Sequence, residues 1–345
     1  MKYTINIMGK NNITKKLNYK EALLNYFSDI FFITAGILIY RYILYYKKFL
    51  LESVQKEILL FAFIYVIIAF PYYLFIKFGS FSRGAQIILG LLDFIKQWGM
   101  YFKKKKTSLP SFSKEFRVCI LFMLVKFFYI PLMLNFATLH IVNIEKAIID
   151  NLHKKPFYDI LYLMIIDLMY LIDTGLYCVG YLVESTYLDS EVKSVESTLS
   201  GWAFTLMCYP PFNIITNYIF PWPQMDPVIF ENPFLTFLFR FFILFLTGVY
   251  VWASIALGPK CSNLTNRGIV NAGPYAFVRH PAYISKNLSW WLMISSINIY
   301  TIVSMSGWLF IYYMRAITEE RHLSKDPDYI EYCKKVPWLF IPYLI

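Results

Sequence analysis

Long apolar stretches separated by shorter polar ones dominate the chain. A membrane-spanning helix needs about 20 mostly apolar residues. Stretches of this kind lie at 27–46, 58–77, 116–139, 157–182, 199–220 and 233–257. The pattern therefore predicts an all-α fold, a polytopic bundle of transmembrane helices.

The last apolar block, residues 288–317, is too long for a single crossing. It is divided near Asn298, so we expect a tight helical hairpin, which brings the total to about eight crossings. The stretch 199–220 is the least regular of the predicted spans, because Pro210-Pro211 should break a helix. Residues 84–102 are more amphipathic and are expected to lie along a surface.

Composition supports a membrane protein over a soluble one. The chain has 345 residues, of which 58% are hydrophobic and 16% charged, against about 25% charged residues in an ordinary soluble domain. This is too few polar residues to cover the surface of a soluble protein of this size. The first 26 residues are polar and lack the apolar core of a signal peptide, so the first apolar stretch is expected to remain as an anchor.

The formal net charge is +11, and the basic residues concentrate in the loop 78–115, which carries the run Lys103–Lys106. Cytoplasmic loops are enriched in lysine and arginine, so this loop, both termini and the loop 258–287 are predicted to be cytoplasmic. No base-reading element accompanies the charge, so nucleic acid is not an expected partner. Five dispersed cysteines and four histidines predict no metal site.

Five charged side chains fall inside the predicted spans, where ionisable groups are costly and often functional. They are Arg41, Lys126, Asp167, Asp173 and Arg240. Two interpretations are open. In the first, the Arg41 side chain reaches the membrane interface and the other charged side chains pair within the bundle. In the second, Asp167, Asp173 and Lys126 line a polar path, as in a transporter.

The chain around the final hairpin has a different character. Gly273-Pro274-Tyr275 and Arg279-His280-Pro281-Ala282-Tyr283 precede the hairpin, and Glu319-Glu320 follow it. Because a hairpin returns the chain to the same membrane face, Arg279-His280 and Glu319-Glu320 are expected to be neighbours. Such a pocket of basic, acidic and aromatic groups would suit a charged cofactor.

These motifs resemble the isoprenylcysteine carboxyl methyltransferase family and its relatives, the phospholipid N-methyltransferases. The resemblance covers about residues 258–340. It rests on the GPY…RHPxY element and on a closing element formed by Glu319-Glu320, Tyr329-x-x-Tyr332 and Val336-Pro337. The chain is accordingly divided into an N-terminal scaffold of about six spans, residues 1–257, and a motif-bearing region, residues 258–345.

The resemblance implies S-adenosylmethionine as the cofactor, bound near the cytoplasmic face, and a lipid-like acceptor that arrives from the bilayer. By the motif match, the cofactor contacts are Tyr275, His280, Tyr283, Glu320 and Arg267, and the catalytic residues are Arg279 and Glu319. Three places depart from the family pattern. Arg267 stands where the family often has histidine, and Ser285 where it usually has glycine. The usual Phe-Gly before the closing tyrosines is replaced around Asp326-Pro327-Asp328.

The acceptor decides which chemistry the site needs. A carboxylate acceptor is already an anion at neutral pH, so an arginine that orients it and the removal of water suffice. An amine acceptor must first lose a proton, which requires a base such as Glu319. O-methylation of a carboxylate is the leading prediction, and N-methylation of a phospholipid headgroup is its rival.

Other interpretations compete with this one. Membrane sterol reductases share an Arg-His-Pro-x-Tyr-like element and use NADPH, although Gly273-Pro274-Tyr275 and Glu319-Glu320 favour the methyltransferase. A transporter would leave the C-terminal motifs unexplained. On a helix, Arg315 and Glu319 are four residues apart, so a plain intrahelical ion pair is also possible.

Overall fold

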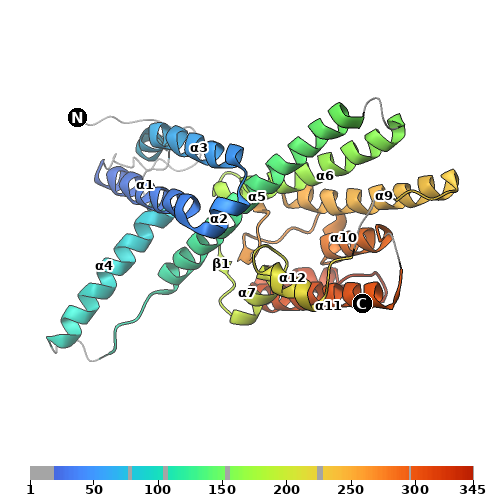
Figure 1. The fold of residues 1–345 in the computed structure, drawn as a ribbon. Coiled ribbons are helices and arrows are strands. Elements are labelled where there is room, and N and C mark those ends of the chain that lie inside the picture. Colours follow the sequence, from blue (N-terminus) through green and yellow to red (C-terminus); the bar gives the residue numbers. More distant parts are fainter. Residues whose placement is uncertain are drawn as a thin grey trace. The chain divides into compact units, whose positions relative to one another are not determined.

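A computed structural model describes residues 19–76, 80–103, 108–151, 156–223, 228–294 and 297–344. Over these residues the chain forms twelve α-helices and a single pair of two-residue strands (Figure 1). This confirms the predicted all-α fold class. The chain divides into two compact units, Met1–Phe127 and Phe128–Ile345.

The first unit contains the first four helices and the start of the fifth. They are α1 (Tyr19–Tyr42), α2 (Leu44–Phe49), α3 (Glu52–Pro71), α4 (Arg83–Phe102) and α5 (Lys114–Asn151), with a π-helical turn η1 (Tyr72–Ile76) after α3. The amphipathic stretch 84–102 is thus helical, as α4. Its predicted position along a membrane surface stays a prediction.

A partly buried carboxylate of α1 ties this helix to three neighbouring helical segments. Asp29 of α1 accepts hydrogen bonds from the hydroxyls of Tyr65 on α3, at 2.7 Å, and of Tyr73 on η1. Its other oxygen accepts from Ser82, at 2.8 Å, and Ser82 in turn caps the N-terminus of α4. Hydrogen bonds to a charged acceptor are stronger than neutral ones, so Asp29 fixes the packing of α1 against its neighbours.

The second unit contains the rest of α5 and all later elements. The helices are α6 (Phe157–Leu182), α7 (Leu199–Leu206), α8 (Asn213–Ile219), α9 (Pro233–Leu257), α10 (Pro281–Leu292), α11 (Ile299–Leu323) and α12 (Pro327–Lys335). Strand β1 (Ser194–Val195) pairs antiparallel with β2 (Thr265–Asn266), and η2 (Gly258–Lys260) and η3 (Gly273–Ala276) are short 3₁₀ turns. Helix α9 packs against α6 on one side and α10 on the other.

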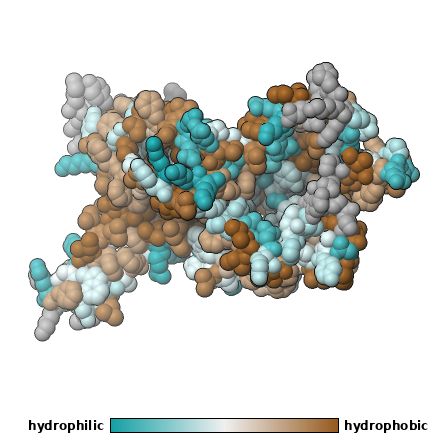
Figure 2. Space-filling model, viewed as in Figure 1, coloured by the Kyte–Doolittle hydropathy of each residue, from teal (hydrophilic) through white to brown (hydrophobic). Residues whose placement is uncertain are grey.

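In the described part of the chain, five helical segments are long and apolar enough to cross a membrane. They are Tyr19–Tyr42, Glu52–Phe75, Lys114–Ile149, Phe157–Leu182 and Pro233–Lys260. Large apolar side chains are exposed over much of the visible face (Figure 2), as expected of surfaces that contact lipid. These helices support the prediction of a multi-pass membrane protein.

The predicted count of about eight crossings is not confirmed. The stretch 199–220 is interrupted around Pro210-Pro211 and forms two helices of 8 and 7 residues, α7 and α8. Proline in a helix interior removes a hydrogen bond and clashes with the preceding turn, so the apolar residues there do not form one long helix. The first arm of the final hairpin, α10, has only 12 residues.

The division of the last apolar block at Asn298 is confirmed. The Asn298 side chain accepts hydrogen bonds from the backbone N–H groups of Tyr300 and Thr301, both at 3.0 Å. The Thr301 hydroxyl accepts from the Asn298 N–H at 2.9 Å. This reciprocal capping box satisfies N–H groups that a helix start leaves unpaired, and it fixes where α11 begins.

The charges inside the second unit's spans have partners close by. His140 Nδ1 lies 2.8 Å from Asp167 Oδ1. Asp173 accepts hydrogen bonds from the hydroxyls of Tyr250 and Ser254. These contacts support the interpretation that intramembrane charges pair within the helices.

Close packing of α6 against the loop after α9 gives a testable prediction. A Cβ added at Gly180 would lie 1.8 Å from the Cys261 carbonyl oxygen, whereas one added at Gly175, on the same helix, would meet nothing within 4 Å. Gly180→Ala should therefore lower stability by about 1–3 kcal/mol, the usual cost of overpacking. Gly175→Ala should be neutral or stabilising, because alanine favours the helix.

Thermal unfolding of the two variants in detergent measures this difference. Equal melting temperatures for Gly180→Ala and Gly175→Ala would contradict the close approach of α6 to Cys261.

Candidate functional site

A glycine turn against α9 sets the start of the motif-bearing loop. Gly273 has φ +62°, a left-handed conformation that side chains other than glycine rarely adopt. A Cβ there would also lie 3.2 Å from Ala256 and from Trp252 of α9. Both constraints require glycine at the start of η3, the turn that carries Tyr275.

The two ends of the motif region are joined by backbone hydrogen bonds. The N–H groups of Arg279 and His280 donate to the carbonyls of Trp338 and Leu339, both at 2.9 Å. The Tyr332 hydroxyl donates to the Tyr275 carbonyl at 2.7 Å. The closing segment of the chain therefore lies along the Arg-His-Pro segment, which explains why the two motifs belong to one site.

Glu320 makes the contacts that were predicted between the Arg279-His280 segment and the end of the hairpin. Its Oε2 lies 2.6 Å from Arg279 Nη1, and its Oε1 lies 2.8 Å from His280 Nε2. The Tyr329 hydroxyl also donates to Oε1. The expectation that Arg279-His280 and Glu319-Glu320 are neighbours is thus confirmed, and one carboxylate holds a basic, an imidazole and a phenol group in place.

These contacts shift the pKa of Glu320. Burial alone would raise it, but the hydrogen bond and charge of His280, the hydrogen bond from Tyr329 and the charge of Arg279 outweigh burial and hold the pKa of Glu320 below its ordinary 4.5. A depressed pKa means that the ionised form is favoured in the folded protein, so ionisation of Glu320 stabilises the fold.

The ionisation of Glu320 makes the stability of the fold depend on pH. The stabilisation is present above the unfolded pKa and is lost as the pH falls through the lower folded pKa. The melting temperature of the wild type should exceed that of Glu320→Gln by a constant amount down to about pH 5 and by a shrinking amount below it. Thermal unfolding of both proteins across this range tests it, and a difference that vanishes between pH 8 and pH 6 would contradict it.

Tyr283 connects the loop to α11. Its hydroxyl donates to Glu319 Oε2 at 2.6 Å, and its ring stacks on His280 with centroids 5.2 Å apart. Among the described residues, Glu319 forms no ion pair with Arg315. The intrahelical pair considered from the sequence is therefore not formed, because Glu319 is bound by Tyr283 instead.

Arg315 is buried, with 5% of its surface exposed. It donates a hydrogen bond to Asn263 Oδ1, and its Cζ lies 5.0 Å from the centroid of the Tyr283 ring and 5.7 Å from that of Tyr209. In the part of the chain that the structure describes, no carboxylate forms an ion pair with it. A buried cation without an anion is costly, so this position would stabilise an anionic ligand.

A cavity connects these groups. The space in it that atoms do not fill amounts to about 1080 Å³, including the part open to solvent. Six of the residues predicted from the motifs line it: Arg267, Tyr275, Arg279, His280, Tyr283 and Glu319. Arg315 lines it too, whereas Glu320 is not among the described lining residues, so its position suits holding Arg279 and His280 in place.

Two of the residues that depart from the family pattern, Arg267 and Ser285, have local structural partners. Arg267 is 2% exposed, and its Nη1 donates to the carbonyls of Val183, Ser190 and Pro259 at 3.1–3.2 Å. It thereby holds three loop segments together while lining the cavity. Ser285 is buried, and its hydroxyl donates to the Pro281 carbonyl at 2.7 Å, which is a contact within α10.

The cavity also has lining residues that were not predicted as site residues, among them Glu196, Arg315 and His322. Helix α11 carries Arg315, Glu319 and His322 at positions i, i+4 and i+7, which lie on one face of a helix. This spacing could have predicted from the sequence that Arg315 and His322 lie on the same side as Glu319. Glu196 has no such signal, since the pairing of β1 with β2 brings it to the site. Among the described residues, no cluster of His, Cys, Asp and Glu could hold a metal ion.

Comparison of the chain with protein-family models, with curated proteins and with solved structures finds no match. The resemblance of the C-terminal motifs to a methyltransferase family therefore stays a prediction from those motifs.

Proposed function

We propose that this protein is an integral membrane methyltransferase that uses S-adenosylmethionine to methylate the carboxylate of a lipid-like acceptor. The observation that carries the choice of acceptor is Arg315, a buried guanidinium that lines the cavity beside Tyr283 without a carboxylate partner among the described residues. An acceptor carboxylate would supply the missing anion.

The side chains around the cavity fit the cofactor. S-adenosylmethionine is a sulfonium cation with an amine and a carboxylate, and when bound it supplies the methyl group. Tyr275 offers an aromatic ring for a cation, and Glu319 offers a carboxylate that already accepts from Tyr283. Arg279 and His280 offer nitrogen donors, held by Glu320.

In this proposal the chain aligns the reactants and needs no general base. Arg315 holds the acceptor carboxylate, which is already ionised at neutral pH. A guanidinium can bind a carboxylate through two parallel hydrogen bonds, which fixes its direction as well as its position. Glu320 acts as a positioning residue, because it touches Arg279, His280 and Tyr329 and not the cavity.

The rival acceptor would ask more of the cavity. A phospholipid headgroup carries a phosphate as well as an amine, so Arg315 would bind its anion too. The amine is cationic at neutral pH and would have to lose its proton to a base such as Glu319, which already accepts a hydrogen bond from Tyr283. O-methylation needs no such proton transfer, so it is the version that we propose.

The proposal also includes the position of the site relative to the membrane. The acceptor is lipid-like or lipidated and enters from the bilayer between the membrane helices. The motif-bearing loop and both termini face the cytoplasm, as the lysine and arginine distribution predicts, so that a water-soluble cofactor has access to the cavity.

Calorimetric titration of the purified protein in detergent tests the proposal. S-adenosylhomocysteine, the stable product form of the cofactor, should bind the wild type, and His280→Ala should weaken binding at least about tenfold, the loss expected for one good hydrogen bond to a charged group. His140→Ala is the matched control, because His140 pairs with Asp167 and does not line the described cavity. Binding of NADPH without binding of S-adenosylhomocysteine would contradict the proposal and favour a reductase.

A further inference from the structure

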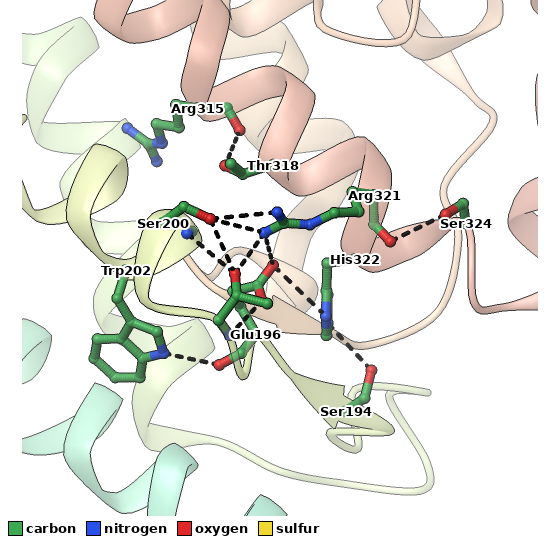
Figure 3. Close-up of polar contacts among 11 residues, drawn as sticks. Ser194, Glu196, Ser200, Trp202, Arg315, Thr318, Arg321, His322 and Ser324 are labelled. Carbon is green, nitrogen blue, oxygen red and sulfur yellow. Dashed lines mark hydrogen bonds and ion pairs between the residues drawn. The ribbon is translucent and has the colours of Figure 1, made fainter.

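One wall of the cavity carries an acid–imidazole pair that the motifs do not include. Glu196 follows β1, and His322 lies near the C-terminal end of α11 (Figure 3). Both line the cavity, and both are buried, with 2% and 6% of their surfaces exposed.

Each side chain is held by one of its two polar atoms. Glu196 Oε1 accepts a hydrogen bond from the Thr198 backbone N–H at 2.8 Å. His322 Nε2 lies 3.2 Å from the hydroxyl of Ser194. The indole of Trp202 donates to the Glu196 backbone carbonyl at 2.8 Å, which fixes this segment further (Figure 3).

The other polar atom of each side chain has no hydrogen-bond partner among the described residues. Glu196 Oε2 and His322 Nδ1 are both buried and lie 4.0 Å apart, too far for a hydrogen bond between them. Arg321 Nη2 is 3.7 Å from Glu196 Oε2, but its hydrogen bonds go to the hydroxyls of Thr198 and Ser200. Buried polar atoms are satisfied in the great majority of cases, so this pair indicates a missing ligand group.

The charge states favour a ligand that donates hydrogen bonds. Burial would raise the pKa of Glu196, but its hydrogen bonds with Thr198 and the nearby His322 and Arg321 outweigh burial, so the pKa of Glu196 is lowered. Burial lowers the pKa of His322, which keeps the imidazole neutral at pH 7. An anion and a neutral imidazole then face the same space.

We propose that Glu196 and His322 form the subsite for a primary ammonium group of the ligand. Resting on the proposed function, this is the α-ammonium of S-adenosylmethionine. An ammonium has three donors and no acceptor, so it can bind Glu196 Oε2 and His322 Nδ1 together. A sulfonium has no such donor, and the amino group of adenine carries no charge to match the carboxylate.

The spacing along α11 agrees with this assignment. Arg315 and His322 are seven residues apart, which corresponds to about 10 Å along the helix axis. The anion-binding arginine and the ammonium subsite are thus separated along one face of the helix. The methionyl chain, the sulfonium and the acceptor carboxylate can lie between them.

The test compares two ligands that differ in the amino-acid end. S-adenosylhomocysteine carries the ammonium, and 5′-methylthioadenosine has the same nucleoside and sulfur without it. In calorimetric titrations, Glu196→Gln should weaken binding of S-adenosylhomocysteine at least about tenfold and leave 5′-methylthioadenosine unchanged. His322→Gln should act in the same direction. Glu191→Gln, an exposed carboxylate of the same loop, is the matched control and should change neither affinity.

Unchanged binding of 5′-methylthioadenosine also shows that the variants are folded. An equal loss for both ligands would overturn the inference, since it would place Glu196 against the nucleoside hydroxyls. Undiminished binding of S-adenosylhomocysteine by Glu196→Gln would overturn it as well. Failure of the wild type to bind either ligand would instead refute the proposed function and, with it, the subsite.

Discussion

Replacing Arg315 by lysine should lower kcat/KM for a prenylated cysteine acceptor by about 100-fold or more, the loss typical of removing a preorganised donor from an active site. Lysine keeps the positive charge but loses the planar fork that holds a carboxylate through two hydrogen bonds. It also loses the stacking of the guanidinium beside the rings of Tyr283 and Tyr209. The carboxylate would then be bound without a fixed direction, and methyl transfer depends on alignment.

Transfer of a labelled methyl group from S-adenosylmethionine measures this effect. Affinity for S-adenosylhomocysteine should change much less than kcat/KM, because Arg315 is assigned to the acceptor. Arg117→Lys, an exposed position on α5, is the control for the substitution itself. An Arg315→Lys enzyme with wild-type kcat/KM would contradict the assignment of Arg315 to the acceptor carboxylate.

Replacing Glu320 by alanine should destabilise the protein by about 1–3 kcal/mol, the cost of leaving partly buried donors without their acceptor. The side chain is only 17% exposed. Its loss leaves Arg279, His280 and Tyr329 without their common acceptor. Methyl transfer should fall with stability, since Arg279 and His280 would no longer be held at the cavity.

Thermal unfolding in detergent distinguishes this effect from that of a surface ion pair. Glu331→Ala is the matched control, because Glu331 pairs with Lys335 on the exposed side of α12 at 2.9 Å and should show no measurable change. A Glu320→Ala melting temperature equal to that of Glu331→Ala would show that the network around Glu320 contributes nothing to stability.

The part of the site that could be predicted from sequence follows from chain topology. A hairpin must return to the membrane face from which it started, so the neighbourhood of His280 and Glu320 could be predicted without knowing any side-chain geometry. The start of α11 at Asn298 could be predicted from the residue type, since asparagine is a strong helix N-cap.

The parts that could not be predicted depend on contacts between distant segments. The i, i+4 rule offered Glu319 a partner in Arg315, but Tyr283, from another helix, takes that place. Glu196 reaches the cavity through a pair of two-residue strands, which leave no hydrophobic pattern in the sequence. The predicted count of about eight spans is not confirmed, and at residues 199–220 the reason is that hydropathy counts apolar residues and does not register how firmly Pro210-Pro211 interrupts a helix.

The most direct test of the central claim is the chemistry of the product. Purified protein is incubated with methyl-labelled S-adenosylmethionine and an S-prenylated cysteine that has a free carboxylate, and the product is then treated with base. A carboxyl methyl ester releases labelled methanol under these conditions, and this is the result we predict. Label that stays with the product as a methylated amine when a lipid extract is the acceptor, with no base-labile product from the prenylated cysteine, would contradict the claim.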